Sequence, residues 1–156
     1  MTKEFGFKPI GYVRTDADED MIRKDRKNVL SEIVISEDLI EALDGIEDFS
    51  HLFIVFYMHR ASNEKISLKV HPRGRKDLPL VGVFATRSPY RPNHLGLTLV
   101  ELVKRDGNKI KVRGLDAIDG TPIIDIKPYG SFRFSSRGSC TRMVDKTSTR
   151  YLRSLH

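Results

Sequence analysis

The stretch GVFATRSPYRPNHLGL, from Gly82 to Leu97, determines how the rest of the chain is interpreted. An apolar run with strand-like composition leads into it, and a second apolar run leads out of it. Proline fixes φ and restrains the residue before it, so Pro89 and Pro92 hold the intervening backbone in extended or turn conformations. A loop stiffened in this way can hold Arg87 and Arg91 at fixed positions, and binding groups on β scaffolds tend to lie on such loops. The alternative is a proline-rich turn whose arginines are simply solvated.

Length and composition indicate one soluble globular domain without a membrane partner. A chain of 156 residues with 39% hydrophobic and 31% charged residues can bury a core of its own. Its longest apolar run, Leu52 to Met58, is too short to cross a bilayer, and the N-terminus lacks the apolar segment of a signal peptide. A single cysteine, Cys140, excludes an internal disulfide and fits a reducing, cytoplasmic location. No cysteine–histidine cluster has zinc-binding spacing, so we expect no metal.

The basic charge is concentrated at the C-terminal end of the chain. Of the net charge of +6, residues 130–156 carry +5, from six basic residues and one acid. A basic extension on a nearly neutral body favours a polyanionic partner, with RNA the leading candidate. The alternative is a solvated tail that binds nothing. We therefore divide the chain into a domain over residues 1–129 and a basic C-terminal extension over residues 130–156.

Hydrophobic patterning predicts a mostly-β chain, because alternating or β-branched apolar runs recur along it. The predicted strands are Phe5–Val13, Ser31–Ile35, His51–Met58, Leu80–Phe84, Leu95–Val103, Lys109–Leu115 and Ile123–Ile126. The dipeptide Asp106-Gly107 predicts a hairpin turn between two of them. About seven short strands with one short helix are typical of a single-domain, all-β or mostly β barrel. No glycine-rich loop follows a strand, so nothing indicates a Rossmann cofactor site.

Three segments allow more specific expectations. The charged segment from Arg14 to Asn28 lacks apolar periodicity and is expected to be a loop. Ser36, followed by two acids and by apolar residues up to a glycine, predicts a short helix with Ser36 as its N-cap. The strand His51–Met58 is nearly all apolar, which predicts burial on both faces. It ends at His59 and Arg60, and polar side chains at the end of a buried strand are candidate site residues, with a structural histidine as the alternative.

The stretch from Gly82 to Leu97 also resembles a family signature, that of the S-adenosylmethionine-dependent tRNA methyltransferases that modify N6-threonylcarbamoyladenosine, the base beside the anticodon. The family pattern is approximately G-[VI]-F-A-T-R-S-x-x-R-P-N-P-[IL]-G-[LM], and the chain departs from it at His94, where the family usually has proline. Three further segments resemble family motifs in the same order: SHLFIVFYMH from Ser50, GLDAIDGTP from Gly114 and DIKPY from Asp125. The similar segments together span roughly residues 7–129.

The resemblance implies a non-Rossmann β-barrel methyltransferase that binds S-adenosyl-L-methionine near the interface of a homodimer and takes tRNA as its substrate. The implied reaction methylates N6 of threonylcarbamoyladenosine. Carried over residue by residue, the cofactor-binding residues would be His59, Arg60, Arg87, Leu97, Asp116, Ala117, Ile118 and Asp119, with Ile22, Arg23 and Lys24 from the charged segment near the N-terminus.

The matching DIKPY motif implies Asp125, Lys127 and Tyr129 as candidate catalytic residues. Methyl transfer from a sulfonium needs a nucleophile held in line with the methyl group, and loss of the N6 proton calls for a base or a water. A structural turn locked by an Asp–Lys pair is the alternative. Arg87 could bind a carboxylate, either that of methionine or that of the threonyl group, through its bidentate fork. His59 could be a hydrogen-bonding wall or a base.

Two departures from the family pattern bear on the substrate. His94 in place of proline is expected to leave the central loop less restrained. The chain ends soon after Tyr129, whereas longer members continue into a domain that helps to hold tRNA, and the basic extension could stand in for that domain. Two other functions stay open: a non-catalytic RNA-binding barrel, which exposed base-stacking aromatics would favour, and a methyltransferase of a small molecule.

Overall fold

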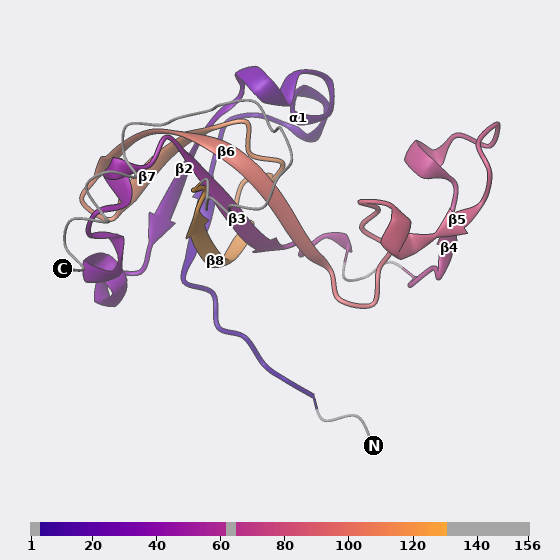
Figure 1. Cartoon of the computed structure of the whole chain (residues 1–156), viewed down its shortest axis with the longest axis horizontal. Coiled ribbons are helices and arrows are strands. Elements are labelled where there is room, and N and C mark those ends of the chain that lie inside the picture. The colour runs from indigo at the N-terminus through magenta and orange to yellow at the C-terminus, as the bar shows by residue number, and fades with distance from the viewer. Residues whose placement is uncertain (1–3, 62–64, 131–156) are drawn as a thin grey trace, which may run out of the picture.

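A computed structural model describes residues 4–61 and 65–130 of the chain. Its centre is a closed antiparallel barrel in which the strands follow the order β1-β2-β7-β6-β3-β8, with β8 paired back onto β1 (Figure 1). The barrel strands are β1 (Gly11–Arg14), β2 (Leu30–Ile35), β3 (His51–Tyr57), β6 (Leu95–Asp106), β7 (Lys109–Arg113) and β8 (Pro122–Pro128). The predicted all-β barrel is confirmed, and β6 and β7 form the predicted hairpin, which turns at Gly107.

The opening strand is shorter than the sequence indicates, because β1 begins only at Gly11. A Cβ at this position would lie 2.3 Å from the carbonyl oxygen of Val34 on β2, so only glycine fits there. The chain therefore enters the barrel where a missing side chain lets two backbones approach closely.

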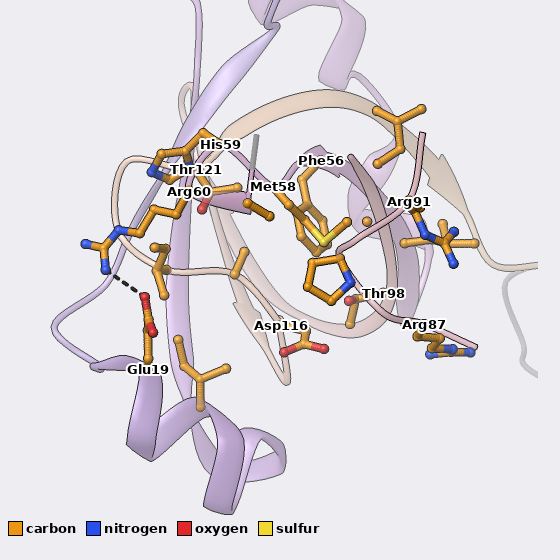
Figure 2. A pocket seen from close by; sticks show the side chains of 18 of the residues that line it. Glu19, Phe56, Met58, His59, Arg60, Arg87, Arg91, Thr98, Asp116 and Thr121 are labelled. Atoms are coloured by element: carbon orange, nitrogen blue, oxygen red, sulfur yellow. Dashed lines mark hydrogen bonds and ion pairs between the residues drawn. The ribbon is translucent and has the colours of Figure 1, made fainter. Parts of the chain in front are cut away.

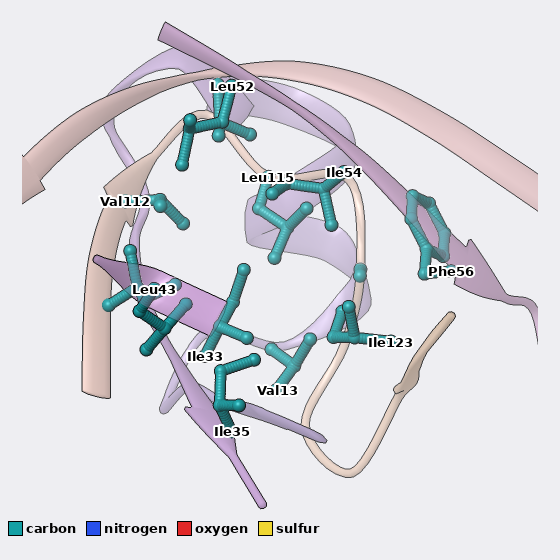
Figure 3. Packing of buried hydrophobic residues seen from close by; sticks show 13 residues of the cluster. Val13, Ile33, Ile35, Leu43, Leu52, Ile54, Phe56, Val112, Leu115 and Ile123 are labelled. Carbon is teal, nitrogen blue, oxygen red and sulfur yellow. The ribbon is translucent and has the colours of Figure 1, made fainter. Parts of the chain in front are cut away.

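Side chains of alternating residues fill the barrel (Figure 3). Along β3, Leu52, Ile54 and Phe56 point inward and are at most 4% exposed, whereas the residues between them are half-buried. The expectation that this strand is buried on both faces is therefore wrong for the single chain. An antiparallel barrel covers the inner face of each strand, and nothing in the described part of the chain covers the outer face of β3 completely.

The charged segment after β1 is not only a loop, as expected, but contains the helix α1 (Glu19–Asp25). Asp18 caps it by accepting a hydrogen bond from the backbone N–H of Met21 at 2.7 Å. Two acids follow in the first turn and two basic residues stand in the last turn, an arrangement that complements the helix dipole. Ile22 is its one buried residue, which is why no apolar periodicity marks the helix in the sequence.

The other helical segments are short turns of 3-10 helix. They are Arg26–Asn28, Glu37–Leu43, Ile46–Asp48, Pro72–Gly74 and Val83–Ala85. The helix predicted after Ser36 is the 3-10 segment Glu37–Leu43, and the Ser36 side chain makes no capping hydrogen bond. Gly45, with φ of 80°, ends it in the left-handed conformation that glycine adopts readily.

Residues 65–94 form an arm that projects from the barrel and carries a separate small sheet of β4 (Lys69–Val70) and β5 (Val81–Gly82) (Figure 1). The predicted strand Leu80–Phe84 is thus shortened to two residues, because the backbone turns into the 3-10 segment Val83–Ala85 directly after Gly82. The arm leaves the barrel after β3 and returns to it at the start of β6.

None of the helices within residues 4–61 and 65–130 has the length and hydropathy needed to cross a membrane. Within the same residues, no group of three or more His, Cys, Asp or Glu side chains could hold a metal ion. The basic extension over residues 130–156 and Cys140 lie outside the described residues, apart from Gly130.

Candidate functional site: a pocket at the mouth of the barrel

A pocket of about 660 Å³ lies where β3 ends and β6 begins, and its volume is within the usual range for a small-molecule or cofactor site. Four segments build it: α1, the end of β3, the central loop with the start of β6, and the loop between β7 and β8. The lining residues are Glu19, Ile22, Arg23, Phe56, Met58, His59, Arg60, Ala61, Arg87, Pro89, Tyr90, Arg91, Leu95, Gly96, Leu97, Thr98, Asp116, Ala117, Ile118 and Thr121.

Arg91 holds the central loop in shape from within. Its guanidinium donates hydrogen bonds to the backbone oxygens of Thr86 at 2.7 Å and Ser88 at 3.0 Å. The Thr86 hydroxyl adds a bond to the oxygen of Val83 at 2.8 Å. Of the two arginines in the stretch, Arg91 therefore has a structural role in addition to its place in the wall of the pocket.

His94 restrains the same loop in place of the proline expected there. Its Nδ1 lies 2.8 Å from the backbone oxygen of Pro89, and because a carbonyl only accepts, Nδ1 carries the proton. The ring is 8% exposed and meets Tyr57 edge to face. The backbone oxygen of His94 accepts from the N–H of Met58, which ties the loop to the end of β3. The loop is therefore fixed by hydrogen bonds where a proline would fix it by its ring, contrary to our expectation of a less restrained loop.

Gly96 allows the start of β6, which lines the pocket, to pack closely against the core. A Cβ at this position would lie 2.3 Å from the ring of Phe56, so the ring packs directly on the glycine backbone. Phe56 and Met58 then supply an apolar floor to the pocket, which Figure 2 shows between the charged groups on its two sides.

The charged side chains of the pocket divide into paired and unpaired groups (Figure 2). Arg60 forms an ion pair with Glu19 of α1 at 2.6 Å across one side, and Asp116 accepts from Arg26 at 2.9 Å. Within residues 4–61 and 65–130, no hydrogen bond or ion pair engages the guanidinium of Arg87 on the opposite side. An exposed, unpaired guanidinium facing a pocket can bind a carboxylate or a phosphate.

The only resolved pKa shifts among the described groups lie outside this pocket, in the arm. Arg75 donates a hydrogen bond to Asp77, which raises the pKa of Arg75 and lowers the pKa of the Asp77 carboxyl. Both groups are fully exposed, so the pair is screened by solvent and places no constraint on the pocket.

Comparison with known proteins identifies the family of this chain. The family model described as "tRNA-methyltransferase O N-terminal domain" matches residues 21–133. The chain belongs to this family. A protein of Methanothermobacter thermautotrophicus named "Probable S-adenosyl-L-methionine-binding protein" is 45% identical over 129 residues, which make up 81% of this chain and 90% of that protein.

Longer relatives share only part of their length with this chain. The mouse protein named "tRNA (adenine(37)-N6)-methyltransferase" is 48% identical over 88 residues, which are 56% of this chain but 20% of that protein. A crystal structure of TrmO superposes with a TM-score of 0.67 at 30% identity, covering 91% of this chain and 65% of that one. The barrel is thus the family's N-terminal domain, and the longer proteins contain more.

In this member of the tRNA-methyltransferase O family, the pocket gathers nine of the eleven predicted cofactor-binding residues: Ile22, Arg23, His59, Arg60, Arg87, Leu97, Asp116, Ala117 and Ile118. Lys24 and Asp119 are not among the lining residues. Asp119 accepts from the backbone N–H of Thr15 at 3.2 Å and lies 3.7 Å from the Arg14 guanidinium. Its contacts thus join the β7–β8 loop to the end of β1.

The three predicted catalytic residues lie on the outer face of the barrel and do not line the pocket. Asp125 and Lys127 of β8 form an ion pair at 2.7 Å, and Asp125 also accepts from the backbone N–H of Ile126. Tyr129 meets the ring of Phe53 edge to face, with centroids 5.5 Å apart. In register, Asp125 pairs with Val55 of β3 and Val55 pairs with Leu97 of β6. Strands lie about 4.8 Å apart, so Asp125 stands about 10 Å from the edge of the pocket at Leu97.

Several lining residues were missed by reasoning from the sequence: Glu19, Phe56, Met58, Thr98 and Thr121. Phe56 and Met58 stand two residues apart before His59, and strand periodicity from the inward Ile54 could have identified the first of them. Glu19 could have been found only by recognising the cap and acidic first turn of α1. Thr98 and Thr121 are nearly fully buried and have no signal in the sequence that separates them from core threonines.

Proposed function

We propose that this protein is an S-adenosyl-L-methionine-dependent tRNA methyltransferase that modifies N6 of an adenine beside the anticodon. The observation that carries the proposal is the Arg87 guanidinium, which has no partner among the described residues and faces a pocket with an apolar floor and acidic side chains, in a chain of the tRNA-methyltransferase O family. The specific substrate that we propose is N6-threonylcarbamoyladenosine, whose threonyl carboxylate could pair with a basic side chain. Relatives named for S-adenosylmethionine binding and for tRNA adenine methylation support this assignment.

The pocket has the groups that such a cofactor requires. Arg87 would hold the methionine carboxylate through its planar fork. Glu19 and Asp116 present carboxylates that accept hydrogen bonds from hydroxyl or ammonium groups, and each stays balanced by the arginine it already contacts. The apolar side chains of Phe56, Met58 and the β7–β8 loop would cover the adenine ring. Bound S-adenosylmethionine would supply an activated methyl group on sulfur.

The role of the protein in the transfer is then mainly positioning. Fixing the cofactor and the base in one orientation can remove several kcal/mol of the barrier. The hydrogen-bonded central loop and the Gly96–Phe56 contact make the pocket walls rigid enough for this. Asp125, Lys127 and Tyr129 remain the proposed catalytic group, which must then act on a base that reaches across the outer face of the barrel.

A homodimer would bring Asp125, Lys127 and Tyr129 closer to the pocket. The outer face of β3, β6 and β8 exposes Leu97, Leu99 and Tyr129, each between 43% and 54%, beside half-buried Phe53 and Val55. A second copy seated on this face would cover apolar surface and put the Asp125–Lys127 pair beside a subunit interface that reaches the pocket at Leu97. Light scattering on the purified chain tests this, with twice the chain mass expected and a monomer at all concentrations as the contrary result.

Calorimetric titration with S-adenosylmethionine tests the cofactor site. The wild type should bind at one site per chain, and Arg87→Ala should weaken binding by at least about tenfold, since a charge-assisted hydrogen bond contributes about 1.5–3 kcal/mol. Arg73→Ala is the matched control, because Arg73 is another exposed arginine of the arm that does not line this pocket. Equal affinity of Arg87→Ala and wild type would remove Arg87 from the site.

A methyl-transfer assay distinguishes an enzyme from a non-catalytic RNA-binding barrel. Incubation with labelled S-adenosylmethionine and threonylcarbamoylated tRNA should place the label on the tRNA, and unmodified tRNA should receive less. RNA binding without cofactor binding, in a protein shown to be folded, would favour the non-catalytic alternative. Transfer to the free nucleoside as fast as to tRNA would favour a small-molecule methyltransferase.

A further inference from the structure

The arm contains a second hollow of about 1240 Å³ whose lining, among the residues that the structure describes, includes basic side chains and no acidic one. The residues that line it are Arg23, Val70, His71, Pro72, Arg73, Gly74, Lys76, Phe84, Ala85, Thr86, Arg87, Ser88, Pro89 and Tyr90. We call this hollow the arm groove. Its four cations are Arg23, Arg73, Lys76 and Arg87, and the described lining places no carboxylate among them, so the groove has the charge pattern of an anion-binding surface.

Two aromatic side chains stand exposed in this basic groove. Phe84 is 79% exposed and Tyr90 is 39% exposed. Val83 before it is buried at 2%, and the 3-10 turn Val83–Ala85 sends successive side chains in different directions, so Phe84 points outward where Val83 points inward. The hydrogen bonds from Thr86 and Arg91 to the backbone oxygen of Val83 and its neighbours fix that turn. The aromatic face is thus held outward by a rigid loop.

The arm groove is continuous with the pocket at the mouth of the barrel. Arg23, Arg87, Pro89 and Tyr90 line both hollows. A flexible chain that brings one unit to the mouth of the pocket would therefore continue along the arm groove. The basic residues farther along, Arg73 and Lys76, are then placed for groups that follow that unit.

We propose that the arm groove binds the single-stranded RNA that flanks the methylated base, with a neighbouring unpaired base stacked on Phe84 and phosphates against Arg73 and Lys76. Single-stranded RNA is bound by just this combination of a basic groove and exposed aromatic rings. The inference rests on the proposed function, because it takes the target adenine to meet the bound cofactor at the mouth of the pocket.

The charge of the groove favours RNA over a second copy of this chain. The first 129 residues carry a net charge of only +1, so another copy as a whole brings no excess of negative charge to the four cations. RNA presents one phosphate per nucleotide along its length. Arg75, whose charge is matched by Asp77, is not part of the groove lining, and of the groove cations only Arg23 forms an ion pair among the described residues, with Asp20 at 3.8 Å.

Fluorescence anisotropy with a labelled anticodon stem-loop RNA, over a series of salt concentrations, tests the proposal. Phe84→Ala should weaken binding about tenfold with an unchanged salt dependence, because stacking is lost and no phosphate contact is. Arg73→Ala/Lys76→Ala should lower the slope of log K against log salt by about 1.4, since each single-strand phosphate contact contributes about 0.7. Lys104→Ala/Lys111→Ala, which removes two lysines paired in register on β6 and β7, is the matched control and should change the slope by less than half as much.

Equal RNA affinity for Phe84→Ala and wild type, or equal slopes for the two double variants, would overturn the proposal. A lower RNA affinity that accompanies a change in oligomeric mass by light scattering would also overturn it, in favour of a second copy on the arm. Calorimetry with S-adenosylmethionine on the same samples separates the two levels of inference. If the wild type does not bind S-adenosylmethionine, the proposed function is wrong. If it binds normally and the arm-groove variants bind RNA as tightly as the wild type, only the proposal for the arm groove is wrong.

Discussion

Replacing Gly96 by alanine should destabilise the protein and disturb its pocket through a single contact. A Cβ at this position would lie 2.3 Å from Cε2 and Cζ of Phe56 and 2.9 Å from its Cδ2. Attractive carbon–carbon contacts begin at about 3.5 Å, so the ring must move by about 1 Å or more. Phe56 is 4% exposed and belongs to the core cluster, so the ring can move only against its core neighbours or into the pocket that it lines.

The magnitude follows from two opposing terms. Overpacking a core costs about 1–3 kcal/mol, and alanine in a strand returns about 0.5–1 kcal/mol relative to glycine. The net loss is about 1 kcal/mol at the middle of these ranges and at most about 2.5 kcal/mol, and each 1 kcal/mol lowers Tm by about 2–4 °C for a domain of this size. Because Phe56 also lines the pocket, its displacement should weaken S-adenosylmethionine binding as well.

Urea denaturation and calorimetric titration measure both effects. Gly82→Ala is the matched control, because a Cβ there meets nothing within 4 Å and its φ of −61° suits any residue. Phe56→Leu removes the ring atoms that clash, so the double variant Phe56→Leu/Gly96→Ala should be more stable than the sum of the single changes predicts. The reasoning is refuted if Gly96→Ala unfolds at the same midpoint as Gly82→Ala, or if the double variant is strictly additive.

Two further substitutions test the framework around the site. Arg91→Lys should cost about 1–2 kcal/mol and weaken cofactor binding several-fold, because one ammonium cannot reproduce the planar fork that spans the Thr86 and Ser88 oxygens; Arg113→Lys, at a solvent-exposed ion pair on β7, is the control in the same denaturation and titration experiments. Ser31→Ala should leave stability unchanged or raise it by up to about 1 kcal/mol, because the buried Ser31 hydroxyl has no partner in the described structure. A loss above about 1 kcal/mol in urea would show that the hydroxyl has a partner after all.

The barrel could be predicted from the sequence because its strands are strongly patterned, whereas the arm could not. The run Leu80–Phe84 looks like one strand, yet only two of its residues pair with β4 before the backbone turns. In the arm, two short strands pair across a basic, glycine-containing loop. Local composition does not indicate that they form a sheet separate from the barrel. The helix α1 was also missed, because it buries only Ile22 and therefore has no apolar periodicity. Its only signals in the sequence are its N-cap and the charges in its first and last turns.

The sequence predicted part of the pocket lining, but it could not predict which residues of one motif face the pocket. Asp116 and Asp119 stand three residues apart in one motif, yet Asp116 faces the pocket and Asp119 ties the loop to Thr15 and Arg14. Their difference arises from the turn that ends at Gly120, where φ is 74°. Arg60 was predicted as a ligand contact, and in the fold it also forms an ion pair with Glu19. These two residues are 41 positions apart in the sequence, so their contact could not be predicted from local spacing.

The central stretch combines two kinds of residue, and they have different consequences for function. Arg91, His94 and Gly96 are satisfied within the protein, by backbone oxygens and by the ring of Phe56. Arg87 and Leu97 face outward, one into the pocket and one toward both the pocket and the outer face of the barrel. A chain that kept the first group and lost Arg87 would keep the shape of the loop without its unpaired cation. Similarity over this stretch is therefore partly similarity of scaffold, and Arg87, whose guanidinium has no partner among the described residues, is the part of the stretch that stays available to a ligand.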